Sequence, residues 1–354
     1  ADPARVRTII KEELGAVRDR FADASRSRLV PDDGEMTHED LIPVGDVVIT
    51  LSRAGYIKRT PVDAFRTQRR GGRGVRGAEM KEDDLVATLL TCSTHDTLLF
   101  FTNRGRVYRI KAYQVPEKQR SAKGVYVANV PGLALEADEQ VATVMPLASF
   151  DPDRFLVFAT AKGTVKRTSL DAFDSPRSVL IALSLNEGDE LIGVTVTSGE
   201  DDLMLVSRRG NAIRFHESDV RPMGRTAAGV RGMRLDADDA VLAMAHARDD
   251  DFLLVVTDRG FGKRTPVSAY PTQRRGGRGV LTARITEARG HLAGGLVVPY
   301  EAEILLVTDA GVVIRMDLAD VRPMGRATQG VSLMRADDDA RVVGVATVVD
   351  EPEE

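Results

Sequence analysis

Short apolar runs, each followed by a turn and a second extended segment, recur six times along the chain. A typical run is 252–256, five apolar residues in succession, which leads through Asp258-Arg259-Gly260 into the second segment. An uninterrupted apolar run of this length predicts a strand that is covered on both faces. Glycine as the third turn residue suits a hairpin whose last turn residue is left-handed. The pattern predicts six β-hairpins, at 47–59, 97–109, 155–167, 203–214, 252–264 and 304–315.

The spacing of the turn glycines predicts how these hairpins are organised. Successive turn glycines are 50, 58, 47, 50 and 51 residues apart. A period near 50 residues predicts a four-stranded unit repeated about a centre. Nineteen residues after the turn glycine, five units have a Gly-Val pair, which we expect to be structural. In the third unit that position is Ala182, and the preceding loop, 174–179, is degraded.

A different pattern precedes the repeats. Apolar residues at helical spacing predict one amphipathic helix over roughly 4–22, followed by a polar linker at 32–39. This helix either belongs to a larger helical element outside this chain or packs on the repeats. The predicted fold is therefore all-β and six-bladed, preceded by one short α-helix. The predicted domains are 1–35, helix and linker, and 36–354, the repeats.

Composition narrows the class of protein. The chain has 354 residues and a formal net charge of -4, with the charged and apolar fractions of a soluble globular protein. The single cysteine, Cys92, excludes an internal disulfide and is consistent with a reducing cytoplasm. No apolar run is long enough to span a bilayer, and no signal-peptide pattern is present. These observations predict a cytoplasmic protein.

A stretch of nine residues, 67–75, is repeated without change at 272–280. Each copy holds three arginines and three glycines and no acidic residue. Guanidinium groups on a loop whose backbone can approach a partner closely suit the phosphates of a nucleic acid. The alternative is a surface linker, which the local charge and the identical duplication disfavour.

Two columns of basic residues emerge when the units are aligned. The first stands four residues after the turn glycine and the second four residues before the Gly-Val pair. Units arranged around a ring place equivalent residues on one rim, so the columns predict a basic belt that offsets the cost of bending a duplex. Structural ion pairs are the alternative for the first column, because strand parity puts it on the same face as apolar residues. The candidates are Arg59, Arg109, Arg167, Arg214, Arg264 and Arg315 in the first column, Arg70, Arg120, Arg225, Arg275 and Arg326 in the second, and Lys123.

Other chemistry finds little support. Short acidic runs such as 236–239 lack the ligand alternation of a calcium loop, and the five histidines are scattered without metal-ligand spacing. No nucleophile elbow, phosphate-binding P-loop or dinucleotide fingerprint is present. We therefore predict no catalytic residue, no metal site and no cofactor.

The repeated stretch QRRGGRG resembles the gyrase A box, QRRGGKG in its commonest form, of the C-terminal domain of the DNA gyrase A protein. The resemblance covers most of the chain, including the period near 50 and the helix, which is similar to the last helix of that protein's coiled-coil arm. It implies a six-bladed β-pinwheel, in which adjacent blades exchange strands, that binds and bends DNA around its rim. A second complete box resembles the twin-box gyrases. The two boxes are Gln68, Arg69, Arg70, Gly71, Gly72, Arg73 and Gly74, and Gln273, Arg274, Arg275, Gly276, Gly277, Arg278 and Gly279.

The resemblance also implies partners. They are duplex DNA, the remainder of the gyrase A protein as a homodimer, and the gyrase B protein, in a cytoplasmic, nucleoid-associated enzyme whose ATP and Mg are bound by other domains. The catalytic tyrosine context is missing, so the chain is expected to wrap DNA without cleaving it, and to be monomeric alone. One alternative is the corresponding C-terminal domain of topoisomerase IV, whose boxes are usually degenerate. Another is a propeller-type protein-interaction scaffold.

Overall fold

The computed structural model describes residues 2–22, 39–52, 54–64, 86–119, 122–310, 312–335 and 340–347. The first box, Gln68–Gly74, and Arg120 lie outside the described residues. Contacts between Cα atoms divide the chain into two units, Ala1–Ile42 and Pro43–Glu354.

The first unit contains the predicted helix, α1 (Pro3–Phe21), and a short 3-10 helix, η1 (Glu39–Leu41). The Asp2 carboxylate accepts a hydrogen bond from the Ala4 amide at 3.0 Å, and proline occupies the first helical position. Both features favour a helix start, because they satisfy or remove amides that have no partner inside the helix. No residue of α1 is buried.

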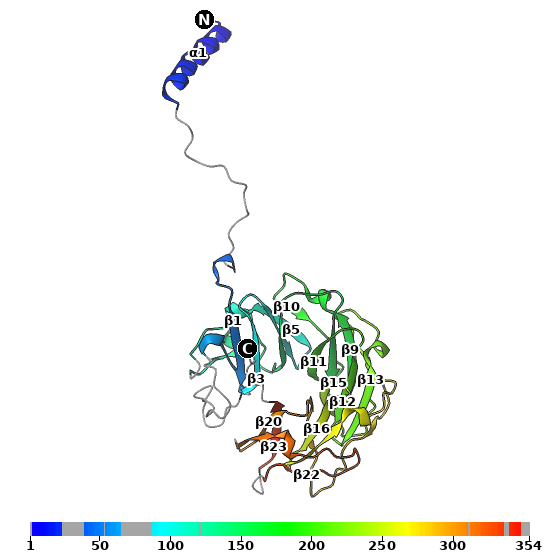
Figure 1. Cartoon of the computed structure of the whole chain (residues 1–354). Helices are drawn as coiled ribbons and strands as arrows, with labels where there is room; N and C mark the ends of the chain where they lie inside the picture. Colours follow the sequence, from blue (N-terminus) through cyan, green and yellow to red (C-terminus); the bar gives the residue numbers. More distant parts are fainter. Residues whose placement is uncertain are drawn as a thin grey trace. The chain divides into compact units, whose positions relative to one another are not determined.

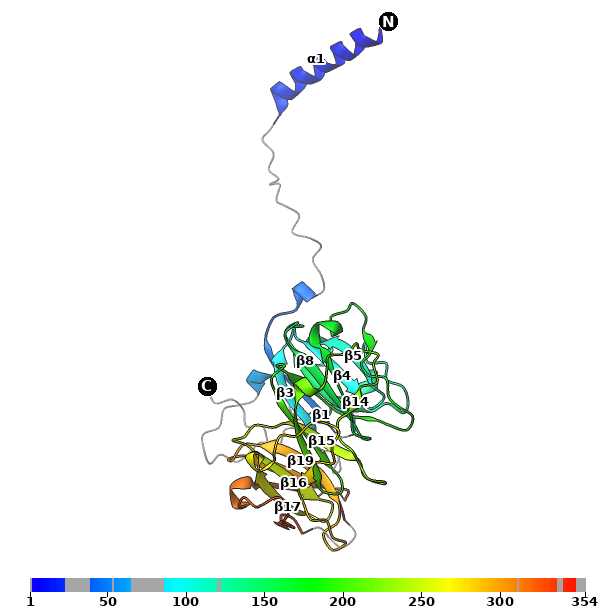
Figure 2. The same cartoon turned by 90° about the vertical axis from the view of Figure 1, so that its right-hand side faces the viewer.

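The second unit is a six-bladed propeller, as the period predicted (Figures 1 and 2). Each blade is an antiparallel sheet. A short 3-10 helix follows its third strand, and one further 3-10 helix, η4, follows β6. The strands of the blades are given from the innermost outward. Blades 1 and 2 are β3 (Val86–Ser93), β1 (Asp46–Ser52), β2 (Tyr56–Pro61) and β6 (Val125–Tyr126), and β7 (Val141–Leu147), β4 (Thr97–Thr102), β5 (Arg106–Lys111) and β10 (Val179–Ile181). Blades 3 and 4 are β11 (Leu191–Thr197), β8 (Phe155–Thr160), β9 (Thr164–Ser169) and β14 (Val230–Arg231), and β15 (Val241–His246), β12 (Asp202–Ser207), β13 (Asn211–His216) and β18 (Val280–Leu281). Blade 5 is β19 (Leu292–Val298), β16 (Phe252–Thr257), β17 (Phe261–Pro266) and β22 (Val331–Ser332), and the described part of blade 6 is β23 (Val342–Thr347), β20 (Glu303–Thr308) and β21 (Val313–Asp317). The 3-10 helices are η2 (Val62–Ala64), η3 (Ala112–Gln114), η4 (Val127–Asn129), η5 (Leu170–Phe173), η6 (Glu217–Asp219), η7 (Val267–Ala269) and η8 (Leu318–Asp320).

The outermost strand of each of the first five blades comes from the following repeat unit. In blade 4, for example, Val280 of β18 pairs with Ala212 of β13, although β18 follows the hairpin of the fifth unit. The loop that precedes each such strand therefore crosses from one blade to the outer edge of the preceding one. This exchange explains why valine recurs after the second glycine, since that valine enters a sheet.

The hydrophobic core consists of five clusters, each made by two adjacent blades. Phe101 of β4 and Phe158 of β8 meet in one cluster, with ring centroids 5.6 Å apart. The central strands of blades 2 to 5 have a neighbouring blade on each side, so both of their faces are apolar. The nearly continuous apolar runs in the sequence have this cause, and the prediction that the strands are covered on both faces is confirmed.

The third unit departs from the register that the sequence predicted. Leu180 pairs with Val107, as Val230 of the next unit pairs with Val165. Both partners stand two residues after their turn glycine, so Leu180 is the counterpart of Val230. Residue 179, and not Ala182, therefore occupies the position of the second glycine. The prediction was wrong because it assumed a constant spacing, whereas the loop before β10 is shorter than its counterparts.

Candidate nucleic-acid interface

The arginine four residues after the turn glycine lies inside the propeller in five blades. Arg264 of β17 has no exposed surface. Its Nη1 donates to the Tyr300 carbonyl oxygen at 2.7 Å, and its Nε donates to the carbonyl oxygen of Val321, in the following unit. Its guanidinium carbon lies 4.3 Å from the centroid of the Tyr300 ring. Arg264 therefore joins two units through an enclosed set of contacts.

Four further members of this column are enclosed in the same way. The side chains of Arg59, Arg109, Arg167 and Arg214 are 15%, 12%, 9% and 11% exposed. These guanidinium groups are enclosed and already have partners, so the contacts of these four and of Arg264 favour the structural role that the sequence left open as the alternative to DNA contact. Arg315 is 55% exposed and pairs with Glu303. The partners of the four are Val115 and Glu117 for Arg59, Asp174 and the Phe150 ring for Arg109, Glu217 and the Phe155 ring for Arg167, and Asp202 and Asp249 for Arg214.

Buried lysines precede this arginine in alternate blades and hold the rim loops. Lys166 Nζ donates to the carbonyl oxygens of Gly224 at 3.2 Å and of Arg225 at 2.5 Å. Lys263 Nζ donates in the same way to Gly325 at 2.7 Å and to Arg326. Each lysine thus fixes the backbone of a loop that carries a candidate arginine. Lys58 in blade 1 donates to Ala122, whereas blades 2, 4 and 6 have Tyr108, Ile213 and Ile314 at this position.

Burial of Lys166 makes its contribution to the free energy of unfolding depend on pH. Burial, with a smaller contribution from the Arg225 guanidinium, lowers the pKa of Lys166 from 10.5 to about 7. A folded-state pKa below the unfolded one gives stability that is complete above the unfolded value and is lost as the pH falls through the folded value. The free energy of unfolding should therefore fall as the pH drops from about 10.5 to about 7, and stay level below that. Chemical denaturation across this range should show a shallower fall for Lys166→Met, and equal falls would contradict the assignment.

The loop of the second box is not held by a buried lysine, because Ile213 takes that position in blade 4. Hydrogen bonds to a neighbouring segment of the chain hold it. The Gly276 amide donates to the Gly232 carbonyl oxygen at 2.6 Å, and the Arg234 amide donates to the Gly277 carbonyl oxygen at 2.8 Å. Arg275 Nη1 donates to the Arg231 carbonyl oxygen at 3.0 Å. The loop therefore lies against the chain segment that links blade 3 to blade 4.

The three arginines of this loop have different surroundings. Arg275, half-buried, also donates from Nε to the Asp219 carbonyl oxygen at 2.8 Å, so it positions the loop. Arg278 is exposed and pairs with Asp236 at 2.8 Å. Arg274 is exposed, and within the described part of the chain its side chain has no ion-pair or hydrogen-bond partner. Arg274 and Arg278 are thus the exposed arginines of this box.

The other predicted loop residues lie at the crossings between blades. Lys123 is exposed, with Nζ 3.8 Å from the centroid of the Tyr56 ring. Arg225 and Arg326 are half-buried, and Arg326 stacks on Tyr270 at 5.9 Å. Among the described residues, no cluster of three or more His, Cys, Asp or Glu has metal-binding geometry.

A comparison with known families agrees with this architecture blade by blade. The family model described as the DNA gyrase C-terminal domain, beta-propeller, matches six successive segments, at residues 46–93, 96–148, 154–198, 201–247, 251–299 and 302–348. The chain belongs to this family. Each matched segment contains the three inner strands of one blade, so the six repeats inferred from the turn glycines are six units of this family.

Curated relatives extend the match over the whole chain. The chain is 46% identical over 356 residues to the DNA gyrase A protein of Mycolicibacterium smegmatis and 46% identical over 359 residues to the DNA gyrase A protein of Staphylococcus aureus. The alignments cover 100% of this chain but 42% and 40% of these relatives. The chain therefore spans about two fifths of the length of the relatives it matches.

Solved structures share the fold. The C-terminal domain of DNA topoisomerase IV superposes with a TM-score of 0.76 at 28% identity, covering 87% of this chain and 94% of that one. A DNA gyrase A C-terminal domain superposes with a TM-score of 0.67 at 24% identity, covering 86% of this chain and 100% of that one. Of the helices in the described residues, none is long and apolar enough to cross a membrane.

The structure of this gyrase-family propeller exposes basic residues that the sequence columns omitted. One group stands in the hairpin turns, directly before the turn glycine. The other stands at the end of the exchanged strand or three residues after it. The first could have been found by aligning the turn triplets for charge as well as for glycine. The second group could be found only once the strand exchange was known. The exchange places the residues after one Gly-Val pair against the loop that precedes the next pair. The added candidates are Lys162, Arg209 and Arg259, and Arg231, Arg234, Arg284 and Arg335.

Proposed function

We propose that this chain binds duplex DNA along the outer rim of its propeller and bends the duplex around that rim. The observation that carries the proposal is the second box, a loop fixed by Arg275 and by backbone hydrogen bonds while Arg274 and Arg278 face outward. Two exposed guanidinium groups on a positioned loop bind phosphate without first having to order the loop. Affinity then rests on phosphates and on the deformability of the duplex, with little readout of base sequence.

The family supports a place for this activity in a larger enzyme. In the whole protein, we propose that the rim wraps a DNA segment with positive handedness and presents it for strand passage, so that ATP hydrolysis elsewhere leaves negative supercoils. Cleavage and ATP hydrolysis then belong to the remainder of the gyrase A protein and to the gyrase B protein. The solved topoisomerase IV domain favours decatenation as a second candidate function. The identities of 46% to DNA gyrase A proteins and the intact second box favour supercoiling.

Wrapping is tested by DNA topology. Nicked circular DNA that is religated in the presence of the chain should retain a positive change in linking number, which grows with the protein-to-DNA ratio. An unchanged linking number would contradict wrapping, even if the chain still binds DNA.

The part played by the second box is tested with two matched double variants. Arg274→Ala with Arg278→Ala should reduce the trapped linking-number change severalfold and lower the slope of log K against log salt by about 2, because each lost phosphate contact contributes about 0.9. Arg154→Ala with Arg248→Ala removes the same charge from exposed positions in the loops before β8 and β16. That control should wrap like the parent. Equal losses in both double variants would indicate an effect of net charge alone.

A further inference from the structure

A basic cavity lies next to the second box, at the boundary between blades 3 and 4. Its volume is about 510 Å³, and its lining residues are Lys162, Arg231, Met233, Arg234 and Leu235. Lys162 stands in the hairpin turn of blade 3, Arg231 ends β14, and Arg234 follows three residues later. Every charged side chain that lines the cavity is a cation, and no carboxylate lines it.

These three cations lack acidic partners. Among the residues that the structure describes, Lys162, Arg231 and Arg234 form no ion pair, although Lys162 Nζ donates to the Glu187 carbonyl oxygen at 2.6 Å. All three residues are exposed. Like charges that face one cavity repel one another, and an anion bound between them removes this cost and gains charge-assisted hydrogen bonds. The cavity therefore favours an anionic ligand.

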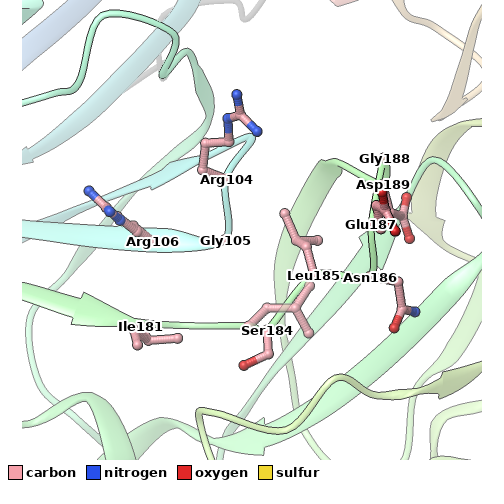
Figure 3. Close-up of a pocket in the computed structure, with 11 residues that line it drawn as sticks. Arg104, Gly105, Arg106, Ile181, Ser184, Leu185, Asn186, Glu187, Gly188 and Asp189 are labelled. Atoms are coloured by element: carbon pink, nitrogen blue, oxygen red, sulfur yellow. The ribbon is translucent and has the colours of Figure 1, made fainter.

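The corresponding cavity one blade earlier has a different charge. This cavity, of about 480 Å³, lies between the turn of blade 2 and residues 181–189 (Figure 3). Arg104 pairs with Asp138, Arg106 pairs with Glu136 at 2.5 Å, and acidic side chains are among the lining residues. Ser184 stands there in the place that Arg234 takes one blade further on. The unpaired set of cations is therefore absent from the boundary one blade earlier, and this earlier cavity provides a control.

The basic cavity and the box loop are held together by hydrogen bonds. The Arg231 carbonyl oxygen accepts from Arg275, and the Arg234 amide donates to Gly277. Two of the three cations are thus fixed at their backbones to the loop that presents Arg274 and Arg278. Consecutive phosphates of one DNA strand can meet such neighbouring groups in turn.

We propose that the Lys162–Arg231–Arg234 cavity is a phosphate-binding site for the DNA backbone, which extends the contact of the second box onto blade 3. The site rests on the proposed function, because its ligand is the same duplex that the box binds. It differs from the box in its residues, none of which belongs to the repeated motif, and in joining the turn of one blade to the exchanged segment of the next. A free phosphate has the same chemistry, and the experiment separates the two sources.

The salt dependence of DNA binding tests the site. The triple variant Lys162→Gln, Arg231→Gln, Arg234→Gln and the control Arg104→Gln, Arg106→Gln are compared with the parent chain on linear duplex between about 50 and about 200 mM salt. We expect the slope of log K against log salt to fall by about 2–3 in the triple variant and by about 1 in Arg234→Gln alone, since each phosphate contributes about 0.9. The control should keep the parent slope, because its arginines pair with Asp138 and Glu136 beside a cavity that Glu187 and Asp189 also line, which disfavours an anion.

Three outcomes distinguish the possible failures. A parent slope in the triple variant would overturn the site while leaving the proposed function intact, and a parent chain that binds no duplex would overturn both. Binding of free phosphate is measured by titrating the chain with inorganic phosphate and monitoring the NMR resonances of the Nε–Hε groups of Arg231 and Arg234. Saturable phosphate binding together with an unchanged duplex slope would assign the cavity to a small anion and overturn the DNA proposal. Because the three side chains are exposed, the triple variant should unfold at the parent temperature.

Discussion

Replacing Arg264 with alanine should lower the free energy of unfolding by about 3–5 kcal/mol, the range for losing a large buried side chain. The change empties a fully enclosed site and leaves the Tyr300 and Val321 carbonyl oxygens without their donor. A buried acceptor without a partner, here the Val321 carbonyl oxygen, costs about 1–3 kcal/mol, and the cavity adds to this cost. The residue looks like a phosphate contact in the sequence, yet its loss should act on stability.

Urea denaturation of the two variants Arg264→Ala and Arg315→Ala provides the measurement. Arg315 stands at the equivalent position of blade 6 but pairs with Glu303 at the surface, so its loss should cost at most about 1 kcal/mol. The two variants differ only in the enclosure of the same side chain. If both lowered the unfolding midpoint equally, enclosure would not be the cause.

Replacing Gly279 with alanine should displace the second box and abolish its contribution to DNA binding. Gly279 has a φ of 74°, and an added Cβ would lie 2.2 Å from the Ala212 carbonyl oxygen. A left-handed alanine costs about 1–3 kcal/mol, and the contact with backbone cannot be relieved by a side-chain rotation. Because β18 pairs at only two positions, we expect the Gly279→Ala variant to relieve the clash by releasing this strand while the blades stay folded.

Gly277, two residues earlier in the same box, is the matched control. An added Cβ there would meet Ile213 Cδ1 at 3.6 Å, an ordinary contact, and the residue is not left-handed. Hydrogen exchange should show lost protection of the Val280 and Leu281 region in Gly279→Ala and parent protection in Gly277→Ala. The linking-number change should fall in the first variant only. A Gly277→Ala variant that behaved like Gly279→Ala would show that the box requires glycine for another reason.

The local pattern predicted most of the fold. The apolar runs, the turn glycines and their period of about 50 residues specified six hairpin units, because a strand with a blade on each side must be apolar on both faces. The shortened loop of the third unit escaped this reasoning. Its register is set by the pairing of Leu180 with Val107, and no constant spacing in the sequence contains that information.

The candidate interface, like the fold, was predictable from the sequence only in part. The sequence by itself determined that this chain is a six-fold repeat with two identical arginine-glycine loops, since identity and periodicity are properties of the letters. Only the tertiary structure decided which arginines face outward. Arg264 and Arg274 are both arginines in repeated positions, but one is enclosed by the following unit and the other is exposed. The physical reason is the exchange of strands: contacts between blades join residues about 50 positions apart, and these contacts set the exposure and pairing of each charge.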